Sequence, residues 1–288
     1  MIPTLTRPHS PALDALLGVA HPVHRHGFVR VVDYMGDDGS IARAARVSYG
    51  RHEVERTEAQ DARLIRYLME HRHTSPSEMC VLKLHIKAPI FVARQWVRHR
   101  MSSTNEQSAR YSALSTDVYV PDSGTICGPP IHNKQGRGEP LPADLAAEVA
   151  ETIHDLTAAA VGWVGTLAAG DDDCPAVAPE IARMVGPVNQ YTEWVWKIDL
   201  HNLLHFLALR LDSHAQREIR DYAEVIAGIV AQWVPATWSA FTDHRLDAVT
   251  LSGPEVWALR EAWAEVDRPP GAADGPAARA MAKITGGD

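Results

Sequence analysis

The 288-residue chain has little cysteine, no long apolar run and no excess of positive charge. Its three cysteines, Cys80, Cys127 and Cys174, lie far apart and are odd in number, unlike a disulfide framework or a Cys-x-x-Cys metal site. No apolar run approaches the ~18 residues of a membrane-spanning helix, and no secretory signal is visible. We therefore expect a cytoplasmic protein in a reducing compartment, with no membrane partner.

The formal net charge of -8 argues against a general nucleic-acid-binding surface, because such surfaces need many clustered basic residues. A local basic pocket for a small anion remains compatible with this charge. Hydrophobic residues make up 45% of the chain and charged residues 22%, which indicates a folded protein with a substantial core. We expect no nucleic-acid partner.

Apolar residues recur at strand spacing in three stretches, residues 28–34, 80–89 and 191–198. Helical spacing predicts helices at residues 41–49, 57–73, 90–100, 143–169, 199–211, 213–234 and 253–266, and a short helix within 174–190. Ser40 and Thr57 are the expected N-caps of the first two helices, and residues 36–40 read as a turn. This pattern favours an α+β fold, with a central, mainly antiparallel sheet flanked by helices and a helical C-terminal part.

Arginines and hydroxyl side chains concentrate in one stretch of this acidic chain, "RQWVRHRMSSTNEQSARYS", at residues 94–112. The helix expected at residues 90–100 would make Arg94 and Arg98 neighbours, as it would Gln95 and His99. Forked guanidinium donors beside hydroxyls suit a phosphate, and amides with a carboxylate can read the edge of a heterocycle. The stretch therefore indicates a nucleotide pocket. The alternative is a solvated loop after a basic helix end.

The same stretch resembles the signature of the flavin-dependent thymidylate synthases. The fixed positions of that signature are matched by Arg98, His99, Arg100, Ser103, Asn105, Glu106, Ser108, Arg110 and Tyr111. The similarity extends over residues 28–245 and includes "ARVSYG", "HRHTSPSEM", "KAPIFVARQW" and "LRLDSHAQREIRDYA". It implies a synthase domain at residues 26–245 and leaves both ends of the chain out. Residues 1–25 mix Pro and His without a clear period, so we expect a variable, loosely attached tail there. The extension at 246–288 is expected to form a helix and then a mobile tail rich in Pro, Gly and Ala.

The resemblance implies an enzyme that methylates dUMP to dTMP and releases tetrahydrofolate. Methylenetetrahydrofolate would donate the one-carbon unit, and NADPH would supply reducing equivalents through bound FAD. The resemblance further implies a homotetramer with active sites at subunit interfaces. The partners expected from it are thus dUMP, folate and NADPH.

The resemblance also assigns the site residues. FAD is expected to contact Ser75, Arg98, His99, Arg100, Glu106, Asp199, Leu200, His201 and His205. The substrate dUMP is expected to contact Gln95, Trp96, Val97, Arg98, Glu106, Gln107, Ser108, Ala109, Arg110, Arg183 and Arg210. Asp199 and His205 stand where some relatives carry asparagine, although an acid at position 199 could still accept from a ribose or adenine group. Ser108 has no sequence-adjacent base, so we interpret it as a hydrogen-bonding ligand and not as a nucleophile.

Arg210 is the expected catalytic residue. Uracil C5 is a poor nucleophile while N3 is protonated, and a guanidinium beside N3 and its carbonyl would favour the anionic, enolate-like form. The alternative for Arg210 is a structural salt bridge with Asp212 or Glu218 near a helix end.

Two other classes of function stay open. His201 and His205 are four residues apart on one expected helix, and with His214, or His71 and His73, they could serve a metal-dependent hydrolase. No glutamate lies between them in the H-E-x-x-H sense, so we expect no metal. The other alternative is a nucleotide-binding module without catalysis.

Overall fold

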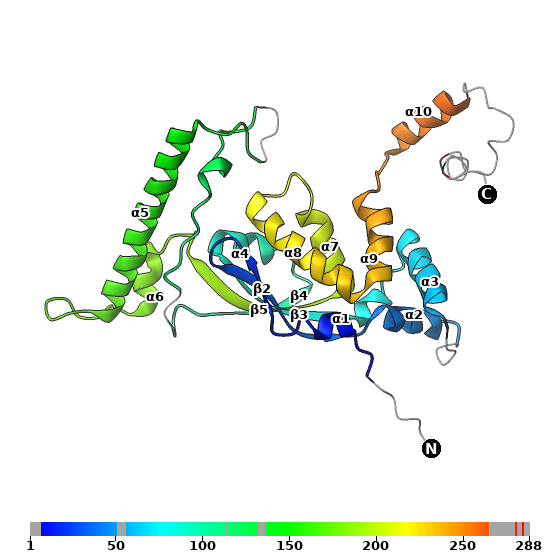
Figure 1. Cartoon of the computed structure of the whole chain (residues 1–288), viewed down its shortest axis with the longest axis horizontal. Helices are drawn as coiled ribbons and strands as arrows, with labels where there is room; N and C mark the ends of the chain where they lie inside the picture. The colour runs from blue at the N-terminus through cyan, green and yellow to red at the C-terminus, as the bar shows by residue number, and fades with distance from the viewer. Residues whose placement is uncertain are drawn as a thin grey trace, which may run out of the picture. The chain divides into compact units, whose positions relative to one another are not determined.

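The computed structural model describes residues 7–50, 56–112, 115–131 and 136–264, together with residues 280 and 284. Its internal contacts divide the chain into two units, Met1–Leu246 and Asp247–Asp288. Strands of the described residues form one five-stranded sheet in the order β1-β2-β3-β5-β4, with every neighbouring pair antiparallel (Figure 1). The expected α+β fold is confirmed.

The two central strands are β3 (Val81–Pro89) and β5 (Tyr191–Asp199), which pair along their whole length from Val81↔Asp199 to Pro89↔Tyr191. The expected alternation is confirmed, because the buried face of β3 carries Leu82, Leu84 and Ile86. The buried face of β5 carries Thr192, Trp194, Trp196 and Ile198. On the far side of β3 lie β2 (Gly27–Met35) and then the edge strand β1 (Ala20–Val23).

The other edge strand, β4 (Ser102–Glu106), differs from the prediction. The expected helix at residues 90–100 is shorter, since α4 (Ile90–Trp96) ends before the arginine-rich turn. The chain then pairs with β5 from Ser102↔Ile198 to Glu106↔Trp194. An edge strand with one solvated side tolerates polar residues. The polar sequence of β4 therefore lacks the apolar alternation by which a strand is predicted. The expected helical pairing of Arg94 with Arg98, and of Gln95 with His99, is therefore wrong.

Helices form the rest of the fold. The described residues contain α1 (Pro11–Asp14), α2 (Asp38–Val47), α3 (Glu58–Glu70), α5 (Ala143–Ala169), α6 (Pro179–Ala182), α7 (Leu200–Arg210), α8 (Arg217–Trp233), α9 (Pro235–Phe241) and, in the second unit, α10 (Gly253–Ala264). Short helical turns add η1 (Ser77–Met79), η2 (Ser123–Thr125), η3 (Arg183–Val185) and η4 (Thr242–Leu246). Among these helices, none is both long and apolar enough to cross a membrane.

Three further expectations need correction. Residues 10–23 are not loosely attached, because Leu13 is fully buried and β1 joins the sheet. The buried apolar residues of this segment, Leu13 and Val23, lie ten positions apart and so gave no periodic signal. The N-cap of α2 is Asp37, whose carboxylate accepts from the Ser40 backbone N–H at 2.7 Å, so the helix begins inside the expected turn. The helix expected at residues 213–234 begins only at Arg217, and a further helix, α9, starts at Pro235 where none was expected. The expected mobile C-terminal tail lies outside the described residues.

The core gathers between the sheet and the helices α4, α7 and α8 (Figure 1). Trp96 of α4 lies at its centre, with ring centroids 5.3 Å from Trp194, 5.3 Å from Trp196 and 4.8 Å from Phe206. Such aromatic pairs add to the stabilisation that their buried area provides. This cluster fixes where α4 ends relative to α7.

The capping box of α3 offers a test of local stability. Thr57 Oγ1 accepts from the Gln60 backbone N–H at 3.4 Å, and Gln60 Oε1 accepts from the Thr57 N–H at 3.1 Å, which confirms the expected N-cap. Thr57→Ala removes one of the two bonds and should lower the free energy of unfolding by about 1 kcal/mol. Urea unfolding measures this loss. Thr57→Ser keeps the hydroxyl and serves as the control; equal losses in both variants would contradict the assignment.

Candidate active site

Arg210 ends α7 and is held by two uncharged acceptors. Its Nε donates to His99 Nε2 at 3.1 Å, and its Nη2 donates to the backbone carbonyl of Gln95 at 3.5 Å. The alternative salt bridges are absent: Asp212 bonds to His214 instead, and Glu218 pairs with Arg137. Within the described residues, the Arg210 guanidinium thus meets no carboxylate, and its positive charge is left for a ligand.

His99 is a neutral acceptor in this arrangement. Burial, together with the charges of Arg210 and His205, lowers the pKa of His99 to about 4. A neutral imidazole offers one ring nitrogen as an acceptor, which matches the Nε–H that Arg210 donates. The His99 ring also packs edge-on against Phe206, with centroids 4.9 Å apart. The turn after α4 is therefore fixed to α7 by one polar and one apolar contact.

The signature stretch continues along β4 into a loop. Thr192 donates to Glu106 Oε1 at 2.8 Å, and the Gln107 backbone N–H donates to the Glu193 carbonyl at 2.8 Å. Arg110 then bonds through Nε to Glu180 of α6 at 3.0 Å. This loop is thus tied both to β5 and to the segment that carries Arg183.

Ser108 has no activating base in the part of the chain that the structure describes. Its Oγ accepts from the backbone N–H of Arg110 at 3.3 Å, and no imidazole, amine or carboxylate bonds to it. A serine nucleophile needs such a base within hydrogen-bond reach. The geometry therefore favours a ligand role for this hydroxyl.

Some of the arginines expected to contact a ligand are exposed. Arg98, Arg100 and Arg183 are all exposed, and none of them forms an ion pair with another described residue. Val97 and Ala109 are also expected to contact dUMP. Val97 is exposed and precedes Arg98, and Ala109 is half-buried and precedes Arg110. Unpaired guanidinium groups on an acidic protein suit an anionic ligand.

Other expected contacts are occupied within the fold. The side chains of Trp96 and Leu200 are buried in the core, so these residues could reach a ligand only through their backbone. The Asp199 carboxylate caps α7 by accepting from the backbone N–H of Asn202 at 2.9 Å and from its side-chain amide at 2.8 Å. Asp199 therefore supports the helix that carries His201, His205 and Arg210.

A cavity of about 380 Å³ lies beside α7. Ile65, Leu68 and Phe241 contribute apolar walls, and His201 and His205 contribute polar groups. Arg72, His73 and Asn202 also line it, although the sequence drew no attention to Arg72 or Asn202. Apolar walls with a few imidazole, amide and guanidinium donors fit a flat heteroaromatic group such as part of a flavin cofactor.

The expected flavin residues are not gathered in one hollow of a single chain. Ser75 lines a separate hollow with Tyr49 and Met79, which shares His73 and Leu68 with the cavity beside α7. Glu106, at the end of β4, lines neither of these hollows. One chain therefore presents the expected contacts as separate groups.

The expected metal alternative finds no support in the geometry. His214 is exposed and bonds to Asp212 at 2.7 Å, apart from the cavity that His201 and His205 line. Among the described residues, no group of three histidine, cysteine, aspartate or glutamate side chains is placed to hold a metal ion.

Comparisons with known proteins agree with the signature. A family model described as "Thymidylate synthase complementing protein" matches residues 30–236. Proteins named flavin-dependent thymidylate synthase are 51% identical over 251 residues in Ruegeria pomeroyi and over 252 residues in Gluconobacter oxydans; each alignment covers 87% of this chain and 82% of the relative. The crystal structure of a UMP/dUMP methylase, PolB from Streptomyces cacaoi, bound with 5-Br dUMP has a TM-score of 0.69 and is 32% identical, covering 78% of this chain and 99% of that chain.

The neutral state of His99 predicts a pH effect on stability. Its pKa in the folded protein is about 4, below the ordinary 6.5, so an unfolded chain takes up a proton that the folded chain refuses. The stabilisation from neutral His99 is complete above pH 6.5 and is lost as the pH falls towards 4. His99→Gln keeps an acceptor for Arg210 but cannot titrate, so its free energy of unfolding should fall less than that of the wild type over this range.

Urea unfolding at pH 7.5 and 5.0, at equal flavin occupancy, measures the difference. His154→Gln, an equivalent change at an exposed position of α5, controls for loss of an imidazole as such. Equal pH dependence in the wild type and the His99→Gln variant would contradict the interpretation.

Proposed function

The chain belongs to the thymidylate synthase complementing protein family, and we propose that the groups around Arg210 form its dUMP site. The enzyme is a flavin-dependent thymidylate synthase that methylates dUMP to dTMP. It takes the one-carbon unit from methylenetetrahydrofolate, uses NADPH as reductant and releases tetrahydrofolate. Family membership disfavours both the metal-dependent hydrolase and the module without catalysis.

One observation carries the assignment of the site: Arg210 is positioned without being neutralised. His99 and the Gln95 carbonyl fix the direction of the guanidinium but bring no negative charge to it. A preorganised cation is effective where negative charge develops in the transition state. Arg210, aimed at a uracil carbonyl, would stabilise the enolate-like ring and place electron density on C5.

We assign the dUMP phosphate to the exposed arginines of the loops. Arg98, Arg110 and Arg183 supply forked donors, and Ser108 adds a hydroxyl. Arg110 would keep or exchange its bond to Glu180 when the phosphate binds. Gln95, Glu106 and Gln107, with the neighbouring backbone of residues 96, 97 and 109, complete the proposed substrate contacts.

The cavity beside α7 is the proposed place for part of FAD. His201 and His205 would donate to the cofactor there, and Ser75, Arg98, His99, Arg100, Glu106, Asp199 and Leu200 complete the expected set. Bound FAD supplies the redox chemistry, because it carries reducing equivalents from NADPH. The apolar wall of Ile65, Leu68 and Phe241 would exclude water from the ring that lies against it.

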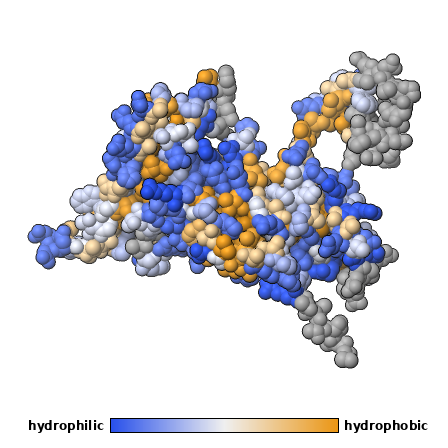
Figure 2. Space-filling model, in the orientation of Figure 1, coloured by the Kyte–Doolittle hydropathy of each residue, from blue (hydrophilic) through white to orange (hydrophobic). Residues whose placement is uncertain are grey.

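We further propose a cytoplasmic homotetramer in which subunits share active sites. Large apolar side chains are exposed along α5, among them Leu145, Leu156 and Trp163. The surface of the molecule carries hydrophobic patches between hydrophilic ones (Figure 2). Met184 and Val185 of η3 are exposed as well. Exposed apolar groups in this number support an interface. The separation of the expected flavin contacts in one chain supports sites completed by another subunit.

Arg210 substitution tests the proposed mechanism. If Arg210 stabilises developing charge, Arg210→Ala should lower kcat along with kcat/KM, on the order of a hundred-fold or more. Arg210→Lys should recover only part of the loss, because an ammonium keeps the charge without the planar fork. Steady-state dTMP formation measures both variants, with flavin content confirmed.

Ser108→Ala is the comparison. It should weaken dUMP binding by ~1 kcal/mol but keep turnover at saturating dUMP. A normal kcat in Arg210→Ala would remove Arg210 from the mechanism. Loss of all turnover in Ser108→Ala, with dUMP and FAD still bound, would restore the serine as a candidate nucleophile.

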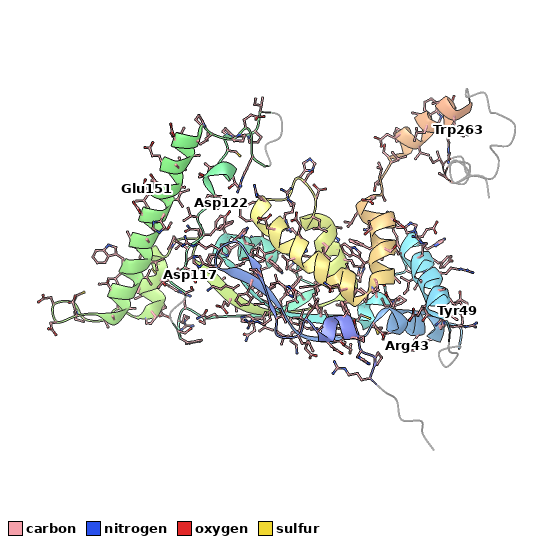
Figure 3. The ribbon with its side chains drawn as sticks, viewed as in Figure 1. Arg43, Tyr49, Asp117, Asp122, Glu151 and Trp263 are labelled. Atoms are coloured by element: carbon pink, nitrogen blue, oxygen red, sulfur yellow. The ribbon has the colours of Figure 1, made fainter. Side chains whose placement is uncertain are left out.

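The proposed assembly has its own test. Light scattering on the FAD-bound protein should give a mass about four times 31.6 kDa. Trp163→Glu places a charge among the exposed apolar groups of α5 and should shift the mass towards smaller species. The exposed Glu151→Gln on the same helix is the control (Figure 3). A stable and active monomer would overturn the proposal.

A further inference from the structure

A buried acid lies behind the proposed dUMP site. Glu218, near the start of α8, is 1% exposed and is the one buried charged residue in the described part of the chain. Burying a carboxylate is costly unless it is paired and hydrogen-bonded. None of the assignments above uses this residue. In the sequence, an acid on the apolar face of the expected helix is the pattern that could have indicated a buried carboxylate.

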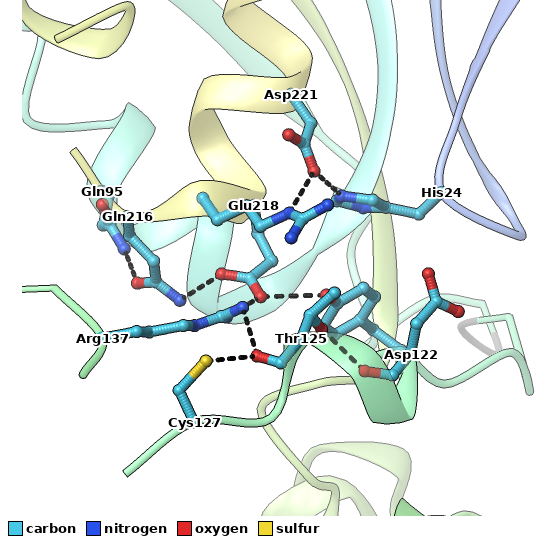
Figure 4. A network of polar contacts seen from close by, with 11 residues as sticks. His24, Gln95, Asp122, Thr125, Cys127, Arg137, Gln216, Glu218 and Asp221 are labelled. Atoms are coloured by element: carbon cyan, nitrogen blue, oxygen red, sulfur yellow. Dashed lines mark hydrogen bonds and ion pairs between the residues drawn. The ribbon is translucent and has the colours of Figure 1, made fainter. Parts of the chain in front are cut away.

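Glu218 is fully supplied with donors (Figure 4). Its Oε1 pairs with Arg137 and accepts from the Tyr119 hydroxyl at 2.9 Å, and its Oε2 accepts from Gln216 Nε2 at 2.8 Å. Arg137 is itself fixed by donating to the Thr125 carbonyl at 3.1 Å. Burial acts to raise the pKa of Glu218, but the bond from Gln216 and the ion pair with Arg137 outweigh it and lower that pKa. The group is an ionised carboxylate.

An ionised carboxylate can only accept hydrogen bonds, and this restricts the next residue. Gln216 must turn its NH2 group towards Glu218, so its Oε1 faces the other way. That oxygen accepts from the side-chain NH2 of Gln95. Gln95 is thereby left with its own Oε1 unused by any described residue. The buried carboxylate thus determines the orientation of the Gln216 amide, which in turn determines the orientation of the Gln95 amide.

Gln95 is also the residue whose backbone carbonyl accepts from Arg210. The residue whose side-chain amide is oriented by Gln216 is therefore the same one that contacts, through its backbone, the group that we assign to a uracil carbonyl. Uracil carries an N3–H donor beside its carbonyls, whereas the N3 of cytosine is an acceptor. A fixed amide oxygen at this place matches the first base and opposes the second.

We propose that Glu218 is a positioning residue that, through Gln216, makes Gln95 present its carbonyl oxygen to the N3–H of uracil. The inference rests on the proposed function, because it takes Gln95 as part of the dUMP site. With N3 protonated in the bound nucleotide, Arg210 would act through the carbonyl, by donating to it as negative charge develops there. Glu218 would thus favour dUMP over dCMP without touching either nucleotide.

Glu218→Gln tests the proposal with little change of shape. A neutral amide at position 218 can present either group to Gln216, so both glutamines become free to reverse and Gln95 can turn its NH2 outward. The affinity for dUMP should fall, and the ratio of the dCMP dissociation constant to that of dUMP should fall by roughly five-fold, the value of about one hydrogen bond. Isothermal titration of each nucleotide into the FAD-bound enzyme measures the ratio.

A ratio between two ligands of one protein does not respond to a general loss of stability. Glu218, Gln216 and Gln95 form the proposed relay. Gln95→Met removes the amide at its end, so the double variant Gln95→Met with Glu218→Gln should have the same ratio as Gln95→Met alone. Asp117→Asn is the matched control (Figure 3), because it also replaces an acid in an ion pair, with Lys87 at 2.8 Å, that does not contact the relay. It should keep the wild-type ratio.

Gln216→Met breaks the relay and leaves Glu218 with Arg137 and Tyr119, so it gives the answer if Glu218→Gln does not fold. An unchanged ratio in the folded Glu218→Gln variant, or in Gln216→Met where only that one folds, would overturn the proposal. The proposal would also be overturned if Glu218→Gln lowered the ratio equally in the wild type and in the Gln95→Met variant. A wild-type enzyme that neither binds dUMP nor forms dTMP would overturn the proposed function itself, which separates the two failures.

Discussion

The packing of Trp96 against β5 and α7 determines where the polar groups of the site can lie. Its ring is enclosed by Trp194, Trp196 and Phe206, so the end of α4 cannot shift without opening the core. Cores are packed as densely as organic crystals, and a displaced indole would leave a costly void. His99 follows three residues later and meets Arg210 as a consequence. An apolar contact thus sets the geometry of a polar one.

The electrostatics around Arg210 depend on keeping carboxylates away from it. Two acids near α7 have other partners, since Asp212 bonds to His214 and Glu218 pairs with Arg137. His99 contributes an acceptor with no charge, because burial and the neighbouring cation keep it neutral. If a carboxylate formed an ion pair with the Arg210 guanidinium, it would neutralise the positive charge that is to act on the substrate. Orientation by neutral acceptors gives direction and retains the charge.

The sequence predicted elements whose residues obey one period. β3, β5 and α3 were recognised because alternation or a capping box lies within the element itself. β4 was not, because its polar residues form a strand only when the edge of β5 is beside them. The same pairing ends α4 early. Within the candidate site, the signature identified Arg98 to Tyr111, but no local pattern could join Gln95, Arg137 and Glu218, which meet only through the fold.

The site therefore combines two kinds of residue with different tasks. The supporting groups, Trp96, His99 and Glu218, are buried or half-buried. Trp96 packs against aromatic rings, and His99 and Glu218 are hydrogen-bonded within the chain. The exposed groups, Arg98, Arg100 and Arg183, have none among the described residues. Side chains that lack internal partners lose entropy when a ligand orders them, so affinity depends on how firmly the supporting groups hold the rest. On these proposals, a change behind the site, at Glu218, would alter which base is accepted, whereas a change among the exposed arginines would alter how tightly dUMP or FAD binds.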